Sequence, residues 1–292
     1  MSKPLQFAYE SMGTRWEILV WDELAAPDFN ALCQDIFQQS KNFDETYSRF
    51  IRTSLVWNLA SKTGPVEVPE DFMNMLGWYK KLYALSGKKL NPLIGYTISD
   101  LGYDADYSLI PKPTIRPTPD LDETVTVLDE HHISLATPVL FDFGALGKGY
   151  FVDKIARFLH QKNVKRFLVN GSGDIYYQGN GVPLQAGLEH PGDTTKVIGS
   201  ISMMQGAMCG SGTNRRRWDK YHHVIDPQQL SSPQGILATW VMADSAVLCD
   251  ALATCLFFTD PEVFQKDFTF EYCILNEQYR VKRSPGFTAD LY

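Results

Sequence analysis

The stretch from Asp244 to Phe258 is apolar almost all round, and this limits the fold more than any other feature of the sequence. A helix without a polar face must be buried. Asp250 and Thr254 are four residues apart and therefore share one face of this helix. A buried carboxylate needs hydrogen bonds or a cation, and an oxygen-only pair suits Mg²⁺ or Ca²⁺ better than zinc. A hydrogen-bonded structural aspartate and a metal ligand fit this pattern equally well.

Strand and helix signals follow one another in both alternating and segregated order, which predicts an α+β fold with one or more mixed sheets. The expected helices span residues 28–46, with Asp28 as the N-cap, 70–85, 147–162 and 244–258. The expected strands span residues 6–10, 15–21, 139–143, 166–170, 174–178, 183–188, 197–205, 271–275 and 279–282. Prolines crowd the loop-rich stretch 86–138, which fits an interdomain linker or a surface connection within one domain.

Charge and composition exclude several classes of protein. With 27 basic and 34 acidic residues the net charge is −7, which argues against nucleic acid or an anionic membrane as the main partner. No run approaches the roughly 18 apolar residues of a spanning helix, and the N-terminus lacks the apolar core of a signal peptide. The five cysteines are widely spread without a C-x-x-C pair, so we expect all of them to be buried and reduced.

Two glycine-rich turns are candidates for ligand binding. The turn within 141–150 joins a strand to a helix, where backbone N–H groups and Lys148 suit a phosphate, although the spacing is not that of a Walker A loop. A plain turn with a solvated Lys148 is the alternative. Gly171-Ser172-Gly173 joins two strands, and a tight connection capped by Asp174 is favoured there over close approach to a ligand.

Basic residues and histidines cluster after Ser211-Gly212. The run Arg215–Arg217 fits an anionic ligand or, equally, an exposed patch that pairs with the acidic surface. His222 and His223 are adjacent on an expected strand and point to opposite faces, so at most one enters a given site. No third ligand with zinc-like spacing lies nearby.

Taken together, these segments resemble the ApbE family of FAD:protein FMN transferases. The matching blocks occur in family order across nearly the whole chain, and K-G-Y-x-V-D and D-A-L-A-T are the most specific. The blocks are M-G-T at 12–14, S-x-F-x-x-x-S-x-x-x-N at 48–58, S-G-x-x-x-N-P at 86–92, D-x-G-A-x-x-K-G-Y-x-V-D at 142–153, G-x-G-D-I at 171–175, S-G at 211–212, Y-x-H-x-I-D-P at 221–227 and D-A-L-A-T at 250–254.

The resemblance implies a single T-fold-like α+β domain over residues 1–292, with mixed or antiparallel sheets flanked by helices and with 86–138 as a long connection. It implies binding of FAD with Mg²⁺ at the pyrophosphate, and transfer of FMN to a Thr or Ser hydroxyl of an acceptor flavoprotein with release of AMP. The implied metal ligands are Asp250, Thr254 and the carbonyl oxygen of Ala145. The implied FAD contacts are Met12, Phe50, Lys89, Leu90, Asn91, Asp142, Lys148 and Ile225.

The resemblance also assigns catalytic roles to Asp250 and to His223, the family histidine near the reacting phosphate. A histidine with a pKa near neutrality suits the removal of a proton from the acceptor hydroxyl. Because many family members are exported lipoproteins and this chain has no lipobox cysteine, we expect a cytoplasmic enzyme without a membrane anchor.

Three positions depart from the family pattern. Asn91 replaces an acidic residue, Phe50 replaces a common Tyr, and Ser172 interrupts a usual Gly-Gly. The first change puts efficiency or adenine recognition in question, while the metal and K-G-Y blocks are intact. Hydrolysis of FAD to FMN and AMP, and FAD binding without turnover, are the alternative functions. The sequence leaves open the acceptor, the number of Mg²⁺ ions, the oligomeric state and the role of Arg215–Arg217.

Overall fold

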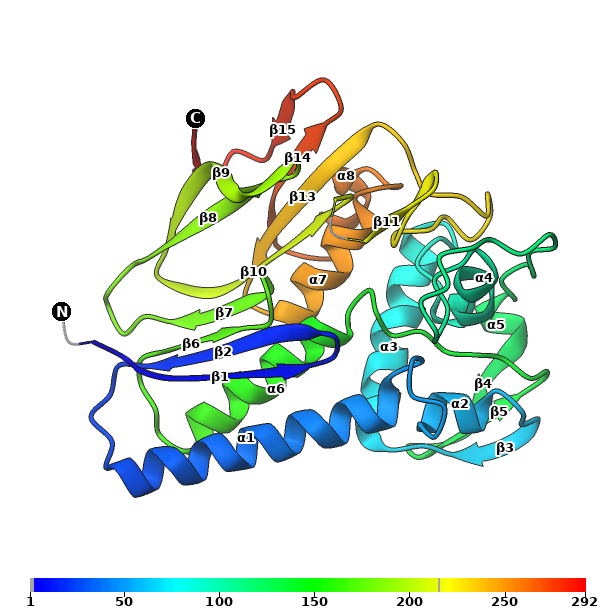
Figure 1. The fold of residues 1–292 in the computed structure, drawn as a ribbon, viewed down its shortest axis with the longest axis horizontal. Helices are drawn as coiled ribbons and strands as arrows, with labels where there is room; N and C mark the ends of the chain where they lie inside the picture. Colours follow the sequence, from blue (N-terminus) through cyan, green and yellow to red (C-terminus); the bar gives the residue numbers. More distant parts are fainter. Residues whose placement is uncertain (1–2, 215) are drawn as a thin grey trace.

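An eight-stranded sheet forms the centre of the fold, in the order β1-β2-β6-β7-β10-β13-β14-β15 (Figure 1). The computed structural model describes residues 3–214 and 216–292. The strands are β1 (Leu5–Ser11), β2 (Thr14–Val20), β6 (Phe167–Asn170), β7 (Ile175–Gln178), β10 (Gln205–Gly212), β13 (Ile236–Ala243), β14 (Glu271–Asn276) and β15 (Val281–Arg283). Every neighbouring pair is antiparallel, so the sheet joins the two ends of the chain without parallel crossovers.

A two-residue turn connects β1 to β2. Ser11 pairs with Thr14 across the hairpin, and Met12 and Gly13 both have positive φ, 52° and 66°. Positive φ at both central residues is typical of the type I′ turn, whose twist matches that of paired strands. The Met12 amide donates to Asp44 Oδ2 at 3.0 Å, which ties the turn to the following helix.

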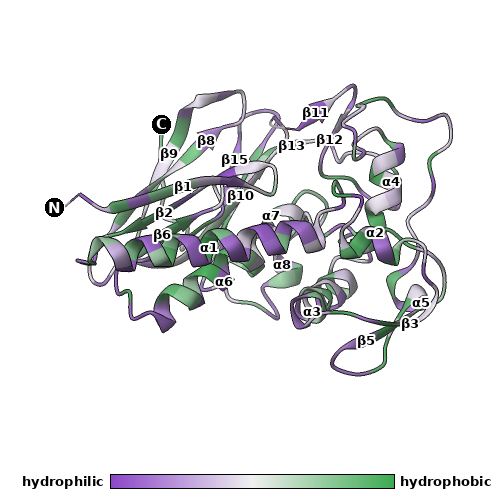
Figure 2. Ribbon diagram, turned by 60° about the horizontal axis from the view of Figure 1, so that its bottom comes forward, coloured by the Kyte–Doolittle hydropathy of each residue, from purple (hydrophilic) through white to green (hydrophobic). Residues whose placement is uncertain are grey.

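Helices cover one face of the main sheet: α1 (Ala26–Tyr47), α6 (Gly147–Gln161) and α7 (Ala246–Cys255) (Figure 1). All residues of α7 except Thr254 are buried, which confirms the expected buried helix. Polar and apolar residues alternate along α1 in Figure 2, because only one of its sides meets the core. The α1 helix begins at Ala26, with Pro27 in its first turn, so the prediction of Asp28 as its N-cap is wrong.

A smaller sheet covers the opposite face of the main sheet. It contains β16 (Asp290–Leu291), β9 (Asp193–Met203) and β8 (Leu184–His190), in that order. A second hydrophobic cluster, which includes Tyr177, Leu188 and Trp240, fills the space between the two sheets. The fold is therefore layered, with helices, main sheet and small sheet stacked in turn, and the α+β class is confirmed.

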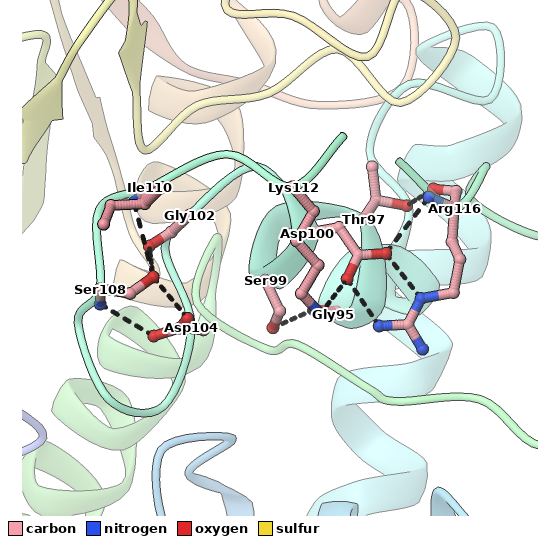
Figure 3. Close-up of polar contacts among 10 residues, drawn as sticks. All are labelled: Gly95, Thr97, Ser99, Asp100, Gly102, Asp104, Ser108, Ile110, Lys112 and Arg116. Carbon is pink, nitrogen blue, oxygen red and sulfur yellow. Dashed lines mark hydrogen bonds and ion pairs between the residues drawn. The ribbon is translucent and has the colours of Figure 1, made fainter. Parts of the chain in front are cut away.

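The stretch 86–138 is irregular but contains short elements. They are η1 (Pro92–Ile94), α4 (Gly95–Asp100), α5 (Leu121–Thr124), β4 (Val125–Val127) and β5 (His132–Leu135). The last two form a sheet with β3 (Gly64–Glu67), which follows α2 (Leu55–Leu59), and these lie beside α3 (Glu70–Leu85), whose predicted limits are confirmed. Side chains help to hold these short elements: Lys112 and Arg116 converge on buried Asp100 (Figure 3).

Three expectations about strands are wrong. Residues 139–143 form no strand, because Leu140 and Asp142 bond to the η1–α4 turn instead of a sheet: Gly95 N donates to Leu140 O and Asp142 N donates to Pro92 O. The expected strand 197–205 is divided, because β9 ends at Met203 and β10 (Gln205–Gly212) begins at Gln205. Ile225 lies outside any strand, after β12 (Tyr221–His222), which pairs with β11 (Arg217–Trp218). The β13 strand was not predicted, and α8 (Pro261–Phe264) follows α7.

The cysteines and the helix lengths agree with the classes of protein that the composition favours. All five cysteines are buried and unpaired, as expected. Within residues 3–214 and 216–292, none of the helices has both the length and the apolar composition needed to cross a bilayer.

Candidate active site

A cavity of about 520 Å³ is lined by segments from nearly the whole chain. They include the β1–β2 turn, the loop after α1, the stretch 89–103, β10, β13 and α7. Of the residues that the family resemblance selects, eleven line it: Phe50, Lys89, Leu90, Asn91, Asp142, Ala145, Lys148, His223, Ile225, Asp250 and Thr254. Met12 does not line it, although its neighbours Gly13 and Thr14 do.

Two carboxylates share one lysine where α6 and α7 meet. Lys148 Nζ forms an ion pair with Asp174 and lies 3.7 Å from Asp250 Oδ1. Gly149 N donates to Asp250 Oδ2 at 2.9 Å. A Cβ at Gly149 would lie 2.2 Å from the Ala246 carbonyl oxygen, so only glycine lets the two helices approach this closely. In the K-G pair of the family block, Lys148 therefore supplies a positive charge and Gly149 allows the two helices to pack closely.

The charges of this cluster do not balance. Burial and then the neighbouring Asp174 raise the pKa of Asp250 to about 7, against the opposing effect of Lys148. Burial would lower the pKa of Lys148, but Asp174 and Asp250 raise it above its usual value, so its ammonium stays charged. Because two carboxylates share one ammonium and Asp250 is only 3% exposed, the ionised form of Asp250 is disfavoured without a further cation.

Asp174 does not act as a turn cap, and Lys148 is not the free surface lysine of a plain turn. The Asp174 side chain does not cap the turn 171–173; Asn170 Oδ1 accepts from Gly173 N at 2.9 Å instead. Lys148 is paired with carboxylates and not solvated. The contact joins residues 26 positions apart, and the sequence offered no signal for it beyond the presence of both in family blocks.

The oxygens available beside this cluster fit a hard divalent cation. Asp250 and Thr254 are one turn apart on α7, and Ala145 lies just before α6; all three line the cavity. A carboxylate, a hydroxyl and a carbonyl are the kinds of ligand that Mg²⁺ takes. A cation there would also favour the ionised form of Asp250.

Arg49 is a site residue that the sequence reasoning missed. It is 4% exposed and forms an ion pair with Asp142, while Nη1 donates to Tyr103 O at 2.6 Å. Its guanidinium carbon lies 4.2 Å from the Phe50 ring centroid and 4.8 Å from that of Tyr103. An Arg directly before Phe50 within the 48–58 block was the only available signal. Arg49 fixes both Asp142 and the Phe50 ring at the cavity wall.

The 89–91 segment is held from two sides. Lys89 Nζ lies 3.5 Å from Asp226 Oδ2 and donates to Phe258 O at 3.3 Å. Asn91 Nδ2 donates to Pro119 O at 2.8 Å, and its Oδ1 accepts from Leu93 N at 2.9 Å. A carboxylate at position 91 would have no donor for Pro119 O. The Asn91 amide therefore closes the 86–138 stretch over the cavity.

His223 enters the cavity and His222 does not, as the alternation of side chains predicts. His222 Nε2 lies 3.1 Å from Pro233 O. His223 Nδ1 is buried without a hydrogen-bond partner among the described residues. Burial, and then the charge of Arg216, lower the pKa of His223 to about 3. The expectation of a pKa near neutrality is therefore wrong for the ligand-free protein, because desolvation and nearby cations oppose protonation.

The arginine run divides between the cavity and the surface. Arg216 lines the cavity, and its carbonyl oxygen accepts a hydrogen bond from His223 N at 3.1 Å. Arg217 is exposed on β11. Arg215 lies outside the described residues.

Comparison with known proteins identifies the family that shares this architecture. The model of the ApbE family matches residues 12–268. A FAD:protein FMN transferase of Haemophilus influenzae is 24% identical over 289 residues, covering 88% of this chain and 81% of its own, and one of Escherichia coli K12 is 22% identical, covering 97% and 88%. The crystal structure of the ApbE protein from Thermotoga maritima has a TM-score of 0.85 at 21% identity over 98% of both chains. The flavin transferase ApbE from Vibrio cholerae has a TM-score of 0.83 at 18% identity, covering 98% and 99%. With its sequence blocks, its fold and nearly its whole length in agreement, this chain belongs to the ApbE family.

Proposed function

We propose that this protein transfers the FMN moiety of FAD to a Thr or Ser hydroxyl of an acceptor flavoprotein, with Mg²⁺ as cofactor and AMP as the second product. The curated relatives are FAD:protein FMN transferases, which supports this activity. The observation that carries the proposal is the acidic cluster of Asp250 and Asp174, of which Asp250 lines a cavity of about 520 Å³. Small-molecule sites measure roughly 300–1,000 Å³.

Asp250, Thr254 and the Ala145 carbonyl oxygen would hold the metal ion. Mg²⁺ bound there would supply positive charge beside the diphosphate of FAD, where negative charge accumulates during transfer. Lys148 stays charged within the same cluster and keeps Asp250 oriented toward the cavity. Positioning and neutralisation of charge are the main requirements of phosphoryl-type transfer.

The rest of the cavity offers surfaces suited to a dinucleotide. The Phe50 ring, packed against the Arg49 guanidinium and the stacked Tyr107 ring, contributes apolar surface to the cavity wall. The stretch 89–91 adds a lysine and backbone groups fixed by the Asn91 hydrogen bonds. Asp142, held by Arg49, completes this wall.

In the transfer step, the acceptor hydroxyl oxygen attacks the FMN-side phosphorus and forms the new P–O bond. The bond from that phosphorus to the bridging oxygen breaks, and the oxygen leaves with AMP. The proton of the hydroxyl passes to His223, which is neutral at pH 7 and has an unpartnered Nδ1 among the described residues. A neutral imidazole is the form that accepts a proton.

The test is a transfer assay with FAD, Mg²⁺ and a candidate acceptor flavoprotein, read by mass spectrometry and by in-gel flavin fluorescence. We expect an FMN adduct on the acceptor and equimolar AMP, and neither when the acceptor Thr or Ser is replaced by Ala or when EDTA is added. AMP released at the same rate without acceptor would identify a FAD hydrolase instead. FAD that stays bound and intact with both Mg²⁺ and acceptor present would identify a binding protein.

A further inference from the structure

The basic side chains that line the cavity differ in whether their charge is already neutralised. In the described part of the chain they are Arg49, Lys89, Lys148 and Arg216. Three of them form ion pairs: Arg49 with Asp142, Lys89 with Asp226, and Lys148 with Asp174 and Asp250. Arg216 has no ion pair with a carboxylate of any described residue. Its positive charge is therefore still available to a ligand.

The Arg216 charge acts inside the cavity. After burial, it is the largest influence on the pKa of His223 and on that of Tyr103, and it lowers both. Arg216, His223, Lys148 and Asp250 line the same cavity, so the Arg216 side chain lies beside the ligand volume that the acidic cluster adjoins. The hydrogen bond from His223 N to Arg216 O at 3.1 Å holds the backbones of the two residues next to each other.

We propose that the Arg216 guanidinium binds the diphosphate group of FAD, beside His223 and opposite the acidic cluster; this assignment rests on the proposed function. The planar guanidinium presents paired N–H donors that match two phosphate oxygens. A diphosphate diester carries two negative charges, and Lys148 is already shared by two carboxylates. Arg216 supplies the balancing charge from the protein.

This assignment connects substrate binding to proton transfer. In the ligand-free protein, burial, Arg216, His222 and Lys148 all oppose protonation of His223. A bound diphosphate neutralises the Arg216 charge and so removes part of this opposition. The run Arg215–Arg217 is therefore divided in role, with Arg216 at the substrate and Arg217 at the surface.

The experiment compares ligand affinities of the wild type, Arg216→Gln, Arg216→Lys and the matched control Arg217→Gln, which removes the same charge one residue away on the surface. FAD, ADP and riboflavin are titrated in EDTA by flavin fluorescence and calorimetry, so that neither metal nor turnover contributes. We expect Arg216→Gln to weaken FAD and ADP about 10- to 100-fold while riboflavin is unaffected, since a charged hydrogen bond contributes at this level. Arg216→Lys should recover part of the loss, and Arg217→Gln should match the wild type.

Equal FAD affinity of the wild type and Arg216→Gln would overturn the assignment. An equal loss of FAD and riboflavin, or an equal loss in Arg217→Gln, would also overturn it, because a local diphosphate contact predicts neither. A wild-type protein that binds FAD but transfers no FMN would refute the proposed function alone. In that case the affinity comparison still decides the role of Arg216.

Discussion

Two aspartates of this protein are almost equally buried and yet have opposite electrostatics. Asp100 is 1% exposed and Asp250 is 3% exposed. Burial alone would raise the pKa of Asp100, but hydrogen bonds from Arg116 and Lys112 lower it to about 2 (Figure 3). Arg116 Nε and Nη2 lie 2.6 and 2.8 Å from the carboxylate, and Lys112 Nζ lies 2.7 Å away. The Asp100 charge is therefore fully compensated within the protein.

The Asp250 charge is not compensated. Its one ion-pair partner among the described residues, Lys148, is also the partner of Asp174, and burial together with Asp174 raises the pKa of Asp250 to about 7. The two aspartates therefore have different roles. Asp100, whose charge is compensated, holds a loop, whereas Asp250, whose charge is not, lies beside a cavity and is suited to bind a metal cation.

The largest effect is expected in catalysis. Asp250→Asn removes one negative charge at nearly constant size, and we expect FMN transfer to fall by about 100-fold or more, because the metal-binding carboxylate is lost. Asp260→Asn is the matched control, since that side chain is 80% exposed just beyond α7. A transfer rate within threefold of the wild type in Asp250→Asn would contradict the metal assignment.

The second effect is in stability and concerns Asp100. Asp100→Ala leaves Arg116 and Lys112 without their shared acceptor, and we expect the free energy of unfolding to fall by about 2 kcal/mol. The partners are about half exposed, so water replaces part of the interaction. Asp106→Ala, which breaks an exposed ion pair with Arg52, should cost less than about 1 kcal/mol. Equal losses in the two variants, measured by urea unfolding, would show that Asp100 is not a structural anchor.

The pH dependence of stability separates the two regions. The pKa of His223 is lowered to about 3, so below its unfolded value of about 6.5 the unfolded chain binds the proton first. The His223 contribution to the free energy of unfolding should then decrease as the pH falls from 6.5 toward 3, by up to about 1.4 kcal/mol per unit, whereas Asp250, whose pKa is raised to about 7, contributes with the opposite sign. His223→Gln should have a shallower slope in this window. The Asp100 contribution is present above its unfolded pKa and is lost only as the pH falls from about 4 toward 2. Identical slopes for wild type and His223→Gln above pH 4 would contradict the burial of a neutral imidazole.

The smallest effect is on thermal stability. Mg²⁺ at ten times its Kd should stabilise the wild type by about 1.4 kcal/mol, which corresponds to about 2–4 °C in Tm. Asp250→Asn should show no shift, while Asp100→Asn should keep it. A shift of the same size in Asp250→Asn would mean that Mg²⁺ binds elsewhere.

Elements that depend on local sequence patterns were predictable, whereas those that depend on long-range contacts were not. The α3 and α6 helices and the buried α7 follow from local periodicity, and their predicted positions are confirmed within a few residues. The 86–138 stretch depends on contacts such as Arg116 with Asp100, which no local pattern encodes. Residues 139–143 have strand-like composition but meet the η1–α4 turn, so tertiary context overrides propensity.

The candidate site divides in the same way. Family blocks selected Lys148, Asp250 and His223, and all three line one cavity. Arg49 was missed, and Asp174 was taken for a turn cap, because their ion pairs join residues 93 and 26 positions apart. The low pKa of His223 arises from burial and Arg216, and neither can be derived from residue spacing.

The central claim is that the uncompensated carboxylate Asp250 binds a divalent cation in the FAD cavity. The most direct measurement is anomalous diffraction from crystals grown with FAD and Mn²⁺ in place of Mg²⁺. We predict one strong anomalous peak at about 2.0–2.3 Å from Asp250, Thr254 and the Ala145 carbonyl oxygen, in contact with the diphosphate. FAD bound in the cavity with no peak there, and with Lys148 as the only cation beside Asp250, would contradict the claim.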